Sequence, residues 1–472
     1  MWRKIAVSII VLLGVIVADM AAAQEKKTKQ LTLDECIKRA LTNSRTLAAE
    51  RHRLAILDAQ VKQAFWAPFS GFSLNAFGSW VPDKCVDKEH LEATGSVRDC
   101  KGGVSGEDNI FEDGFWTGGW GPSLQLEISG GVPIYTFGKI SSGKEAVEHA
   151  RAAKQAEYPR FEDAIRYQVA QAYQAVSGAR EMLYTINKGR EHLEKARKKV
   201  EQDLENQEGT STEIDLIKLK VFEGEVDQYE TQSREIERVG LAGLRFLVGG
   251  KERSLVDIID EPQSQTPEEI GKLDEYKKEA VQNRPELKAV RHAAKALAAK
   301  VDMRRADFWP DLLVVGGFRY GWTPGKTDLH NWALKDNYNY GPSIFLGLAV
   351  SYKLDLGLDI YRLDEAQAEL SALTTEQKAA LEGVVLEVEK IYHHAVATRD
   401  ALESMQKSRR LVKGWIAAVM QNHATGLASA KEVKDALAEY FKVMAAIHKL
   451  THDYNVGLAE IHRVTGVSRV KQ

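Results

Sequence analysis

The chain has 472 residues, with 28% charged and 44% hydrophobic side chains, 11 prolines and a formal net charge of -3. This composition is typical of a folded, helix-rich protein and excludes a disordered one. The near-neutral charge, without a basic groove interleaved with aromatic residues, argues against nucleic acid as a partner.

The N-terminus carries the pattern of a secretory signal peptide. The basic residues of Met1–Lys4 precede an apolar run from Ile5 to Val17, which is followed by the small residues Ala21–Ala23. We expect cleavage after Ala23, so that residues 1–23 are a signal peptide. The apolar run is too short to span a bilayer, and an uncleaved anchor is the less favoured alternative.

The sequence repeats itself in a constant order. Leu33–Glu35 recurs as Leu273–Glu275, and Phe65–Pro68 has a counterpart in Phe308–Pro310. An ordered series of this kind predicts two equivalent structural units. We place them at residues 24–262 and 263–472, joined through a segment rich in proline and acidic residues.

Both repeats show the same sequence of periodicities. In each, a helical pattern gives way to two segments of alternating apolar residues around a loop, and then to a long helical hairpin. In the first repeat we expect a helix at 32–64, strands at 69–80 and 120–133, a loop at 81–119 and a hairpin at 143–250, interrupted at Pro159. In the second we expect a helix at 274–306, strands at 311–322 and 342–354, a loop at 323–340 and a hairpin at 360–466.

The alternating segments predict strands with one apolar face. Trp80, Trp322 and Tyr352 near the strand ends suit an aromatic belt at a lipid boundary, whereas a soluble sandwich is the alternative. In lipid, every backbone donor and acceptor must be paired, and four strands cannot close on themselves. Lipid-facing strands therefore require oligomerisation.

The long helices carry the spacing of coiled-coil seams, with apolar residues alternately three and four apart. Each hairpin turns at a glycine, Gly209 in the first repeat and Gly426 in the second. The second hairpin has the clearest seams: Val384, Val388, Ile391, Ala395, Thr398, Leu402 and Met405 on one helix, and Val433, Leu437, Tyr440, Met444, Ile447, Thr451, Tyr454, Leu458 and Ile461 on the other.

Three cysteines are present: Cys36, Cys85 and Cys100. In an oxidising compartment, Cys85 and Cys100 are the candidate disulfide pair because they flank a loop, which leaves Cys36 alone on a helix. Three unpaired thiols are the alternative, since sequence does not fix connectivity.

The order of elements resembles that of the TolC-like outer membrane efflux proteins over about Leu31 to Val467. The most specific pieces are Val132–Lys139 and the two glycine turns. The resemblance implies an α+β membrane protein of the outer membrane that extends into the periplasm. It implies a homotrimer with a transmembrane β-barrel of about 12 strands, four per chain, continued by a periplasmic α-helical coiled-coil tunnel.

The same resemblance implies a function and partners. The chain is expected to be a passive export duct of a tripartite efflux pump or a type I secretion system. Its expected partners are outer membrane lipid, a periplasmic adaptor (membrane fusion) protein and an inner-membrane transporter or secretion ATPase. A soluble periplasmic coiled-coil adaptor or scaffold is the alternative function.

Acidic residues near the turns are the candidate pore constriction. Glu432 and Asp435 lie three apart on one helical face, either lining a pore or solvated in a first helical turn. The resemblance implies an acidic, cation-favouring periplasmic mouth there, with Asp215 as the corresponding lock residue. The family's basic partner position is Ala428 here, and His423 replaces an aromatic hydroxyl.

With the family's basic residue missing, we expect Lys431 or Lys434 to hold the closed mouth. The expected adaptor-docking tip consists of Gly209, Thr210, Gly426 and Leu427. Ile214, Leu216 and Val433 either join this surface or are buried in the seams.

Nothing in the sequence predicts an enzyme, a metal or a cofactor. His448 and His452 lie four apart on a helix, but without a His-Glu-x-x-His pattern they are expected to be surface histidines. No glycine-rich phosphate loop follows a strand.

Overall fold

The computed structural model describes residues 29–82, 120–206, 211–250, 253–262, 264–322 and 340–467. Residues 1–23, Cys85, Cys100, Gly209 and Thr210 lie outside this part, as does most of both predicted loops. The chain divides into two compact units. The first consists of the described residues of Met1–Leu54, Ala153–Arg291 and Glu376–Gln472, and the second of those of Ala55–Ala152 and His292–Thr375.

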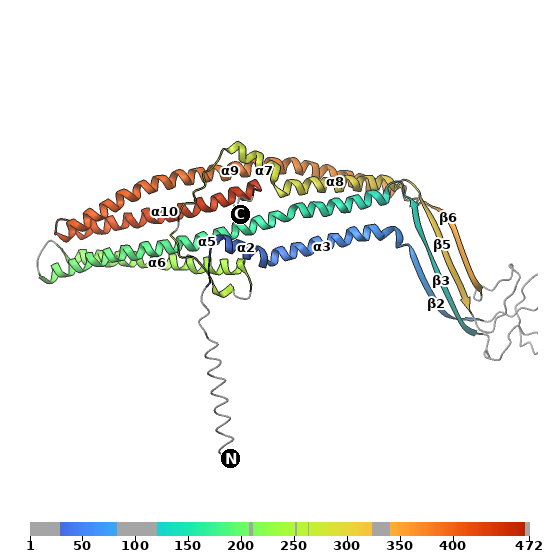
Figure 1. Ribbon diagram of the computed structural model, residues 1–472, viewed down its shortest axis with the longest axis horizontal. Helices are drawn as coiled ribbons and strands as arrows, with labels where there is room; N and C mark the ends of the chain where they lie inside the picture. Colours follow the sequence, from blue (N-terminus) through green and yellow to red (C-terminus); the bar gives the residue numbers. More distant parts are fainter. Residues whose placement is uncertain are drawn as a thin grey trace, which may run out of the picture. The chain divides into compact units, whose positions relative to one another are not determined.

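The elements follow one another as helices, a strand pair and a long helical hairpin, twice over (Figure 1). In chain order they are β1 (Lys29–Leu31), α2 (Leu33–Asn43), α3 (Arg45–Trp66), η1 (Ala67–Phe69), β2 (Phe72–Pro82), β3 (Trp120–Tyr135), α5 (Lys139–Asn206), α6 (Glu213–Val248), η2 (Arg253–Leu255), β4 (Val256–Ile258), α7 (Leu273–Asn283), α8 (Pro285–Ala306), β5 (Asp311–Trp322), β6 (Tyr340–Ser351), α9 (Leu356–Ala424) and α10 (Ala430–Thr465).

Two of the expected helices are each broken in two. The first is interrupted at Ser44, whose hydroxyl accepts from the Leu47 amide at 3.2 Å and so starts α3 as a capping residue. The second is interrupted at Arg284, because Pro285 excludes the helical conformation for the residue before it and is itself suited to the first helical position. In contrast, α5 continues through Pro159.

The second unit contains an antiparallel sheet in the order β2-β3-β5-β6 (Figure 1). One face of the sheet is apolar across all four strands, because Leu74 pairs in register with Ile128, Ile128 with Phe318, and Phe318 with Ile344. Ile344, Leu346 and Leu348 of β6 are at least 80% exposed. The apolar face is therefore uncovered within the described chain.

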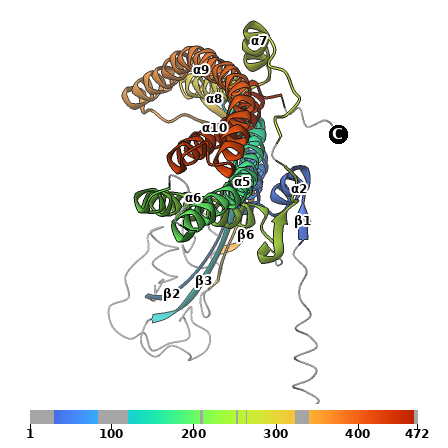
Figure 2. The same ribbon diagram turned by 90° about the vertical axis from the view of Figure 1, so that its left-hand side faces the viewer.

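The first unit contains a row of four long helices. Gly240 of α6 lies against Val176 of α5, Gly189 of α5 against Phe441 of α10, and Gly457 of α10 against Ala395 of α9. The order across the row is therefore α6, α5, α10, α9, as Figure 2 shows end-on. Among the described residues, no helix combines the length and the hydropathy needed to cross a membrane.

The predicted seams are the core of this row. All the predicted seam residues of α9 and α10 are buried except Met405 and Tyr440, which are half-buried and pack against the same core. A shared core joins both hairpins near their turns, with Val200 of α5, Leu219 of α6, Ile416 of α9 and Val433 of α10. The coiled-coil prediction is therefore confirmed.

Cys36 of α2 is fully buried in the core of the first unit. Burial raises the pKa of its thiol to about 12, with a smaller contribution from Glu35. Cys36 is a free, neutral core residue.

Charged residues meet where α8 begins beside α9 and α10. Arg284, 5% exposed, binds Glu387 of α9 at 2.7 Å, and Glu387 also binds Arg463 of α10 at 3.0 Å. Because Glu387 receives two guanidinium groups, its pKa is lowered despite its partial burial.

Asp163 of α5 lies beside this network without a close partner. Its nearest cation, Arg166, is 3.9 Å away. Burial, reinforced by Glu162 and Glu286, raises the pKa of the Asp163 carboxyl to about 6. The fold therefore opposes the ionisation of this side chain.

The helix interiors offer a matched pair of glycine substitutions. A Cβ on Gly189 would lie 2.1 Å from the buried Phe441 ring, whereas a Cβ on Gly224 meets nothing within 4 Å. We expect Gly189→Ala to destabilise the chain by about 1–3 kcal/mol through overpacking. We expect Gly224→Ala to stabilise it by up to about 1 kcal/mol through helix propensity. Equal thermal unfolding midpoints for the two variants, measured by circular dichroism, would contradict the packing.

Asp163→Asn is expected to change how stability depends on pH. Folding raises the pKa of Asp163 from about 3.9 to about 6, so the folded state favours the protonated carboxyl. The stability that this protonation contributes is complete below about pH 3.9 and is lost as the pH rises through about 6. We expect the variant to gain about 2 kcal/mol over the wild type at about pH 7.5 and little at about pH 4.5. Thermal unfolding at both pH values measures this, with the exposed Asp364→Asn as the control.

Candidate functional site

The two hairpin turns begin their second helices with the same hydrogen-bonded motif. At the start of α6, the Thr212 amide donates to Asp215 Oδ2 at 3.2 Å, and the Asp215 amide donates to Thr212 Oγ1 at 3.3 Å. At the start of α10, the Ser429 amide donates to Glu432 Oε2 at 2.8 Å, and the Glu432 amide donates to Ser429 Oγ at 3.3 Å. Each is a capping box, so Asp215 and Glu432 both have a structural role.

Asp215 is held within its own turn. The Thr212 hydroxyl donates to Oδ2 at 2.7 Å, and Lys218 lies 3.5 Å from Oδ1. The Thr212 hydroxyl, followed by the Thr212 amide and Lys218, lowers the pKa of this carboxyl. Asp215 is therefore an anion near neutral pH, with a side chain only 16% exposed.

The two acidic residues of the predicted pore constriction at the start of α10 remain open to solvent. Glu432 is exposed, and Asp435, whose side chain is 45% exposed, binds Lys434 at 3.0 Å. Among the described residues, no ion pair or hydrogen bond joins Asp215 to Glu432 or Asp435. The structure thus places the three predicted carboxylates at the starts of two helices, each with a partner from its own helix or turn.

The second turn depends on Gly426. Its φ of +76° lies in the left-handed region that favours glycine. This conformation lets the amides of Leu427 and Ala428 both donate to the Asn422 carbonyl, at 2.8 and 3.2 Å. Leu427 is left 80% exposed at the turn.

The predicted docking residues separate by burial. Ile214 is 62% exposed, as a tip residue would be. Val433 is 1% exposed and Leu216 packs against the shared core, so both are seam residues. Gly209 and Thr210 lie outside the described residues.

His423 is the residue at this turn whose role was not foreseen. It is 5% exposed, and its Nδ1 donates to the Ala428 carbonyl at 2.9 Å. Its Nε2 has no hydrogen-bond partner in the described chain. Of the two lysines expected to hold the closed mouth, Lys434 binds its neighbour Asp435 at 3.0 Å.

Beside His423 lies an anchored carboxylate of the first hairpin. Asp203 binds Lys199 at 2.7 Å and accepts from the Ser211 hydroxyl at 3.0 Å. The Lys199 hydrogen bond, with smaller contributions from Ser211 and from the nearby His423, lowers the pKa of Asp203. From the sequence, His423 was recognised only as a departure from the family's pattern. Its burial was not predicted, because burial depends on how the two hairpins pack.

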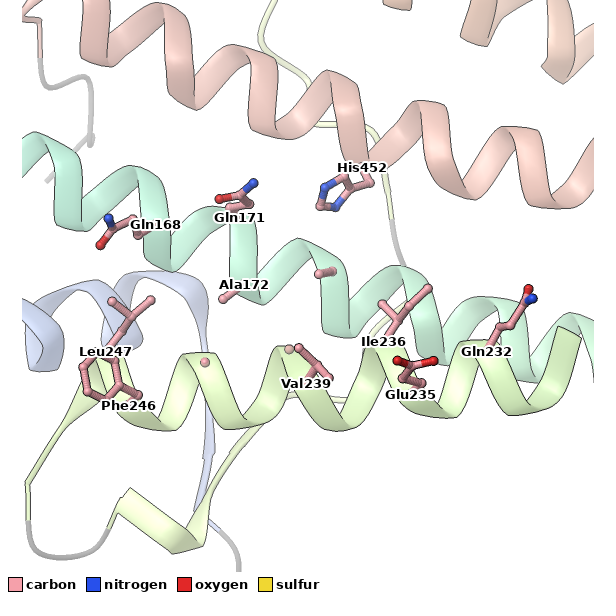
Figure 3. Close-up of a pocket in the computed structure, with 13 residues that line it drawn as sticks. Gln168, Gln171, Ala172, Gln232, Glu235, Ile236, Val239, Phe246, Leu247 and His452 are labelled. Carbon is pink, nitrogen blue, oxygen red and sulfur yellow. The ribbon is translucent and has the colours of Figure 1, made fainter. Parts of the chain in front are cut away.

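An open groove of about 760 Å³ runs along α5 and α6 in the first unit. Figure 3 shows Gln168 and Gln171 on α5, Val239 and Phe246 on α6, and His452 on α10. Amides and aliphatic side chains dominate this lining.

A second hollow of about 490 Å³ adjoins the groove around His448. His448 Nε2 lies 3.1 Å from the Thr185 hydroxyl, and burial lowers the pKa of His448 to about 4. His448 is thus a neutral, half-buried residue, and not the surface histidine that the sequence predicted. Within the described residues, no group of three or more His, Cys, Asp or Glu side chains is placed to hold a metal ion.

The capping box at α10 leads to a prediction. Ser429→Ala removes the acceptor for the Glu432 amide, and we expect it to destabilise the start of α10 by about 1 kcal/mol. Hydrogen exchange of the first-turn amides of α10 should become several-fold faster. Ser404→Ala is the control, because that hydroxyl only bonds to the Asp400 carbonyl within a helix. Equal exchange in both variants would show that the cap does not hold the turn.

Comparison with known proteins finds one family model and several solved structures that resemble this chain. Residues 277–467 match the model of the outer membrane efflux protein family. No curated protein matches the sequence. Three solved channels illustrate the structural likeness. The outer membrane protein VceC of Vibrio cholerae is 20% identical, with 92% of this chain and 96% of that chain covered and a TM-score of 0.71.

The CmeC outer membrane channel of Campylobacter jejuni is 13% identical, with 95% of this chain and 91% of that chain covered and a TM-score of 0.70. The MtrE outer membrane channel of Neisseria gonorrhoeae is 16% identical, with coverages of 93% and 90% and a TM-score of 0.70. The chain therefore resembles the outer membrane efflux proteins in sequence over residues 277–467 and shares the fold of these three solved structures over nearly its whole length, as the sequence predicted.

Proposed function

We propose that this chain is the outer membrane channel subunit of a tripartite efflux pump or a type I secretion system. It serves as a passive duct from the periplasm to the exterior. The observation that carries the proposal is the sheet β2-β3-β5-β6, whose apolar face is exposed on all four strands while its opposite face carries all of the charged and amide side chains of its described strands. A sheet of this kind fits between lipid and water.

The sheet needs further copies of itself to be stable in lipid. Its outer strands β2 and β6 each pair on one side only within the described chain. Unpaired backbone groups cost several kcal/mol each in hydrocarbon, so the edges must be joined. A homotrimer would close a barrel of about 12 strands from four strands per chain.

The helices also present an unpaired face that supports a trimer. Apolar residues on the exposed side of α6 continue along most of its length at spacings of three, four, seven or eight, which keep them on one face of the helix. Each is at least 43% exposed: Ile214, Ile217, Val221, Tyr229, Ile236, Val239 and Phe246. In the proposed assembly, this stripe packs against a neighbouring copy and extends the coiled-coil tunnel into the periplasm.

The acidic residues of the turns then surround the periplasmic mouth. Glu432 and Asp435 of three copies would form an acidic, cation-favouring constriction, with Asp215 at the corresponding place in the first repeat. The similar capping boxes at the two turns support the proposed internal duplication. The core that both hairpins share near their turns, and the nearness of His423 to Asp203, support a closed mouth held by contacts between hairpins.

The exposed Leu427 and Gly426, together with Gly209 and Thr210 of the first turn in the sequence, are the proposed docking tip for a periplasmic adaptor. An inner-membrane transporter or secretion ATPase would supply the energy. A soluble adaptor or scaffold is less well supported, because it has no use for an exposed apolar sheet.

Single-channel recording tests this function. The purified mature chain is reconstituted in planar bilayers beside Glu432→Ala/Asp435→Ala. We expect cation-preferring events whose selectivity falls in the double variant, because the acidic ring is removed. Asp400→Ala/Glu403→Ala is the matched control, since these acids are also three apart and exposed on α9.

The outcomes separate the parts of the proposal. Channels with unchanged selectivity in the double variant would show that the mouth is elsewhere. A chain that never inserts or conducts would favour the scaffold function.

A further inference from the structure

One row on the polar face of the sheet carries two opposite charges, Glu127 and Arg319. Asn75, Glu127, Arg319 and Ser343 are register partners on β2, β3, β5 and β6. Side chains of directly opposite residues emerge on the same face about 5 Å apart. The four side chains therefore form a single line across the whole sheet.

The other charged residue of the described sheet, Asp311, lies on the same face, in the row that pairs it with Ser351. Asp311 stands at the start of β5 and binds Lys139 at 3.1 Å. Glu127 and Arg319 lie inside their strands instead. The residue after Glu127, Ile128, and the residue before Arg319, Phe318, pair with each other on the apolar face.

The rows beside the charged one are uncharged and mostly small. On one side are Ser73, Ser129, Gly317 and Phe345, and on the other Phe77, Gln125 and Gly321. A Cβ on Gly317 would lie 2.5 Å from the Phe345 ring, so this ring lies flat over the glycine. Arg319, by contrast, is exposed, and Glu127 is half-buried.

The face on which these charges lie decides what they meet. A basic residue on the lipid face of a barrel costs about 2–4 kcal/mol at the bilayer midplane. Arg319 and Glu127 therefore belong on the water side of the sheet.

We propose that the row Asn75–Glu127–Arg319–Ser343 lines the lumen of the barrel and sets its preference between cations and anions. This inference rests on the proposed function, because the row becomes a ring only when three sheets close. In that ring, Glu127 attracts cations and Arg319 attracts anions, and their near balance gives the barrel a weak preference of its own. The row is a second charge filter, separate from the acidic residues of the hairpin turns.

Reversal potentials in a potassium chloride gradient across planar bilayers test the proposal. Arg319→Gln leaves the carboxylates unopposed and should shift the permeability ratio toward potassium by roughly twofold or more. Glu127→Gln should shift it toward chloride by a similar factor. Gln125→Asn, an uncharged change in the adjacent row, is the matched control and should leave the ratio unchanged.

Two further measurements guard against a folding defect. Asn75→Asp adds a carboxylate to the row without removing anything, and it should shift the ratio toward potassium. Raising the salt to about 1 M should shrink all the shifts, because the Debye length falls to about 3 Å.

The results distinguish this inference from the function on which it rests. Wild-type channels that open normally while both charge variants keep the wild-type ratio, or shift it in the same direction, would overturn the charge filter alone. If the wild-type chain forms no channel, the proposed function fails first. Opposite shifts in the two variants would establish the ring.

Discussion

The pairing of backbone hydrogen-bonding groups is the constraint on which the rest of this structure depends. A four-stranded sheet that is apolar on one face and polar on the other is not stable by itself in water or in lipid. Its apolar face requires hydrocarbon, and its two edges require further strands. Copies of the same chain satisfy both needs at once, so the sheet links the proposed location to the proposed assembly.

The helical unit follows a similar logic in water. Its four long helices form a single row whose seams are filled by Leu, Val, Ile and Tyr side chains, such as Leu437 and Tyr454. A single row of helices buries only part of its apolar surface. The exposed apolar stripe on α6, which includes Val239 and Phe246, is apolar surface that the row does not bury. It gives the outer side of α6 a second apolar face for packing.

At the hairpin turns, structure and proposed function use the same residues. Glu432 caps α10 through the Ser429 amide, yet its side chain is exposed and carries charge to the turn. The two roles are compatible, because a capping carboxylate at a helix start remains an anion on the surface. Asp215 has the same capping role but is more enclosed, so its charge is more firmly fixed to its own turn.

Local patterns in the sequence were sufficient for the alternating strands, the seam residues of α9 and α10, and the glycine turn at Gly426, because these depend on neighbours a few residues away. Even the breaks at Ser44 and Pro285 have local causes, a capping serine and a proline, although the periodicity spanned them. Tertiary structure alone decided the burial of His423, the placing of Leu216 in the core, and the alignment of Glu127 with Arg319. These depend on the packing and register of segments far apart in the chain, which no local pattern encodes.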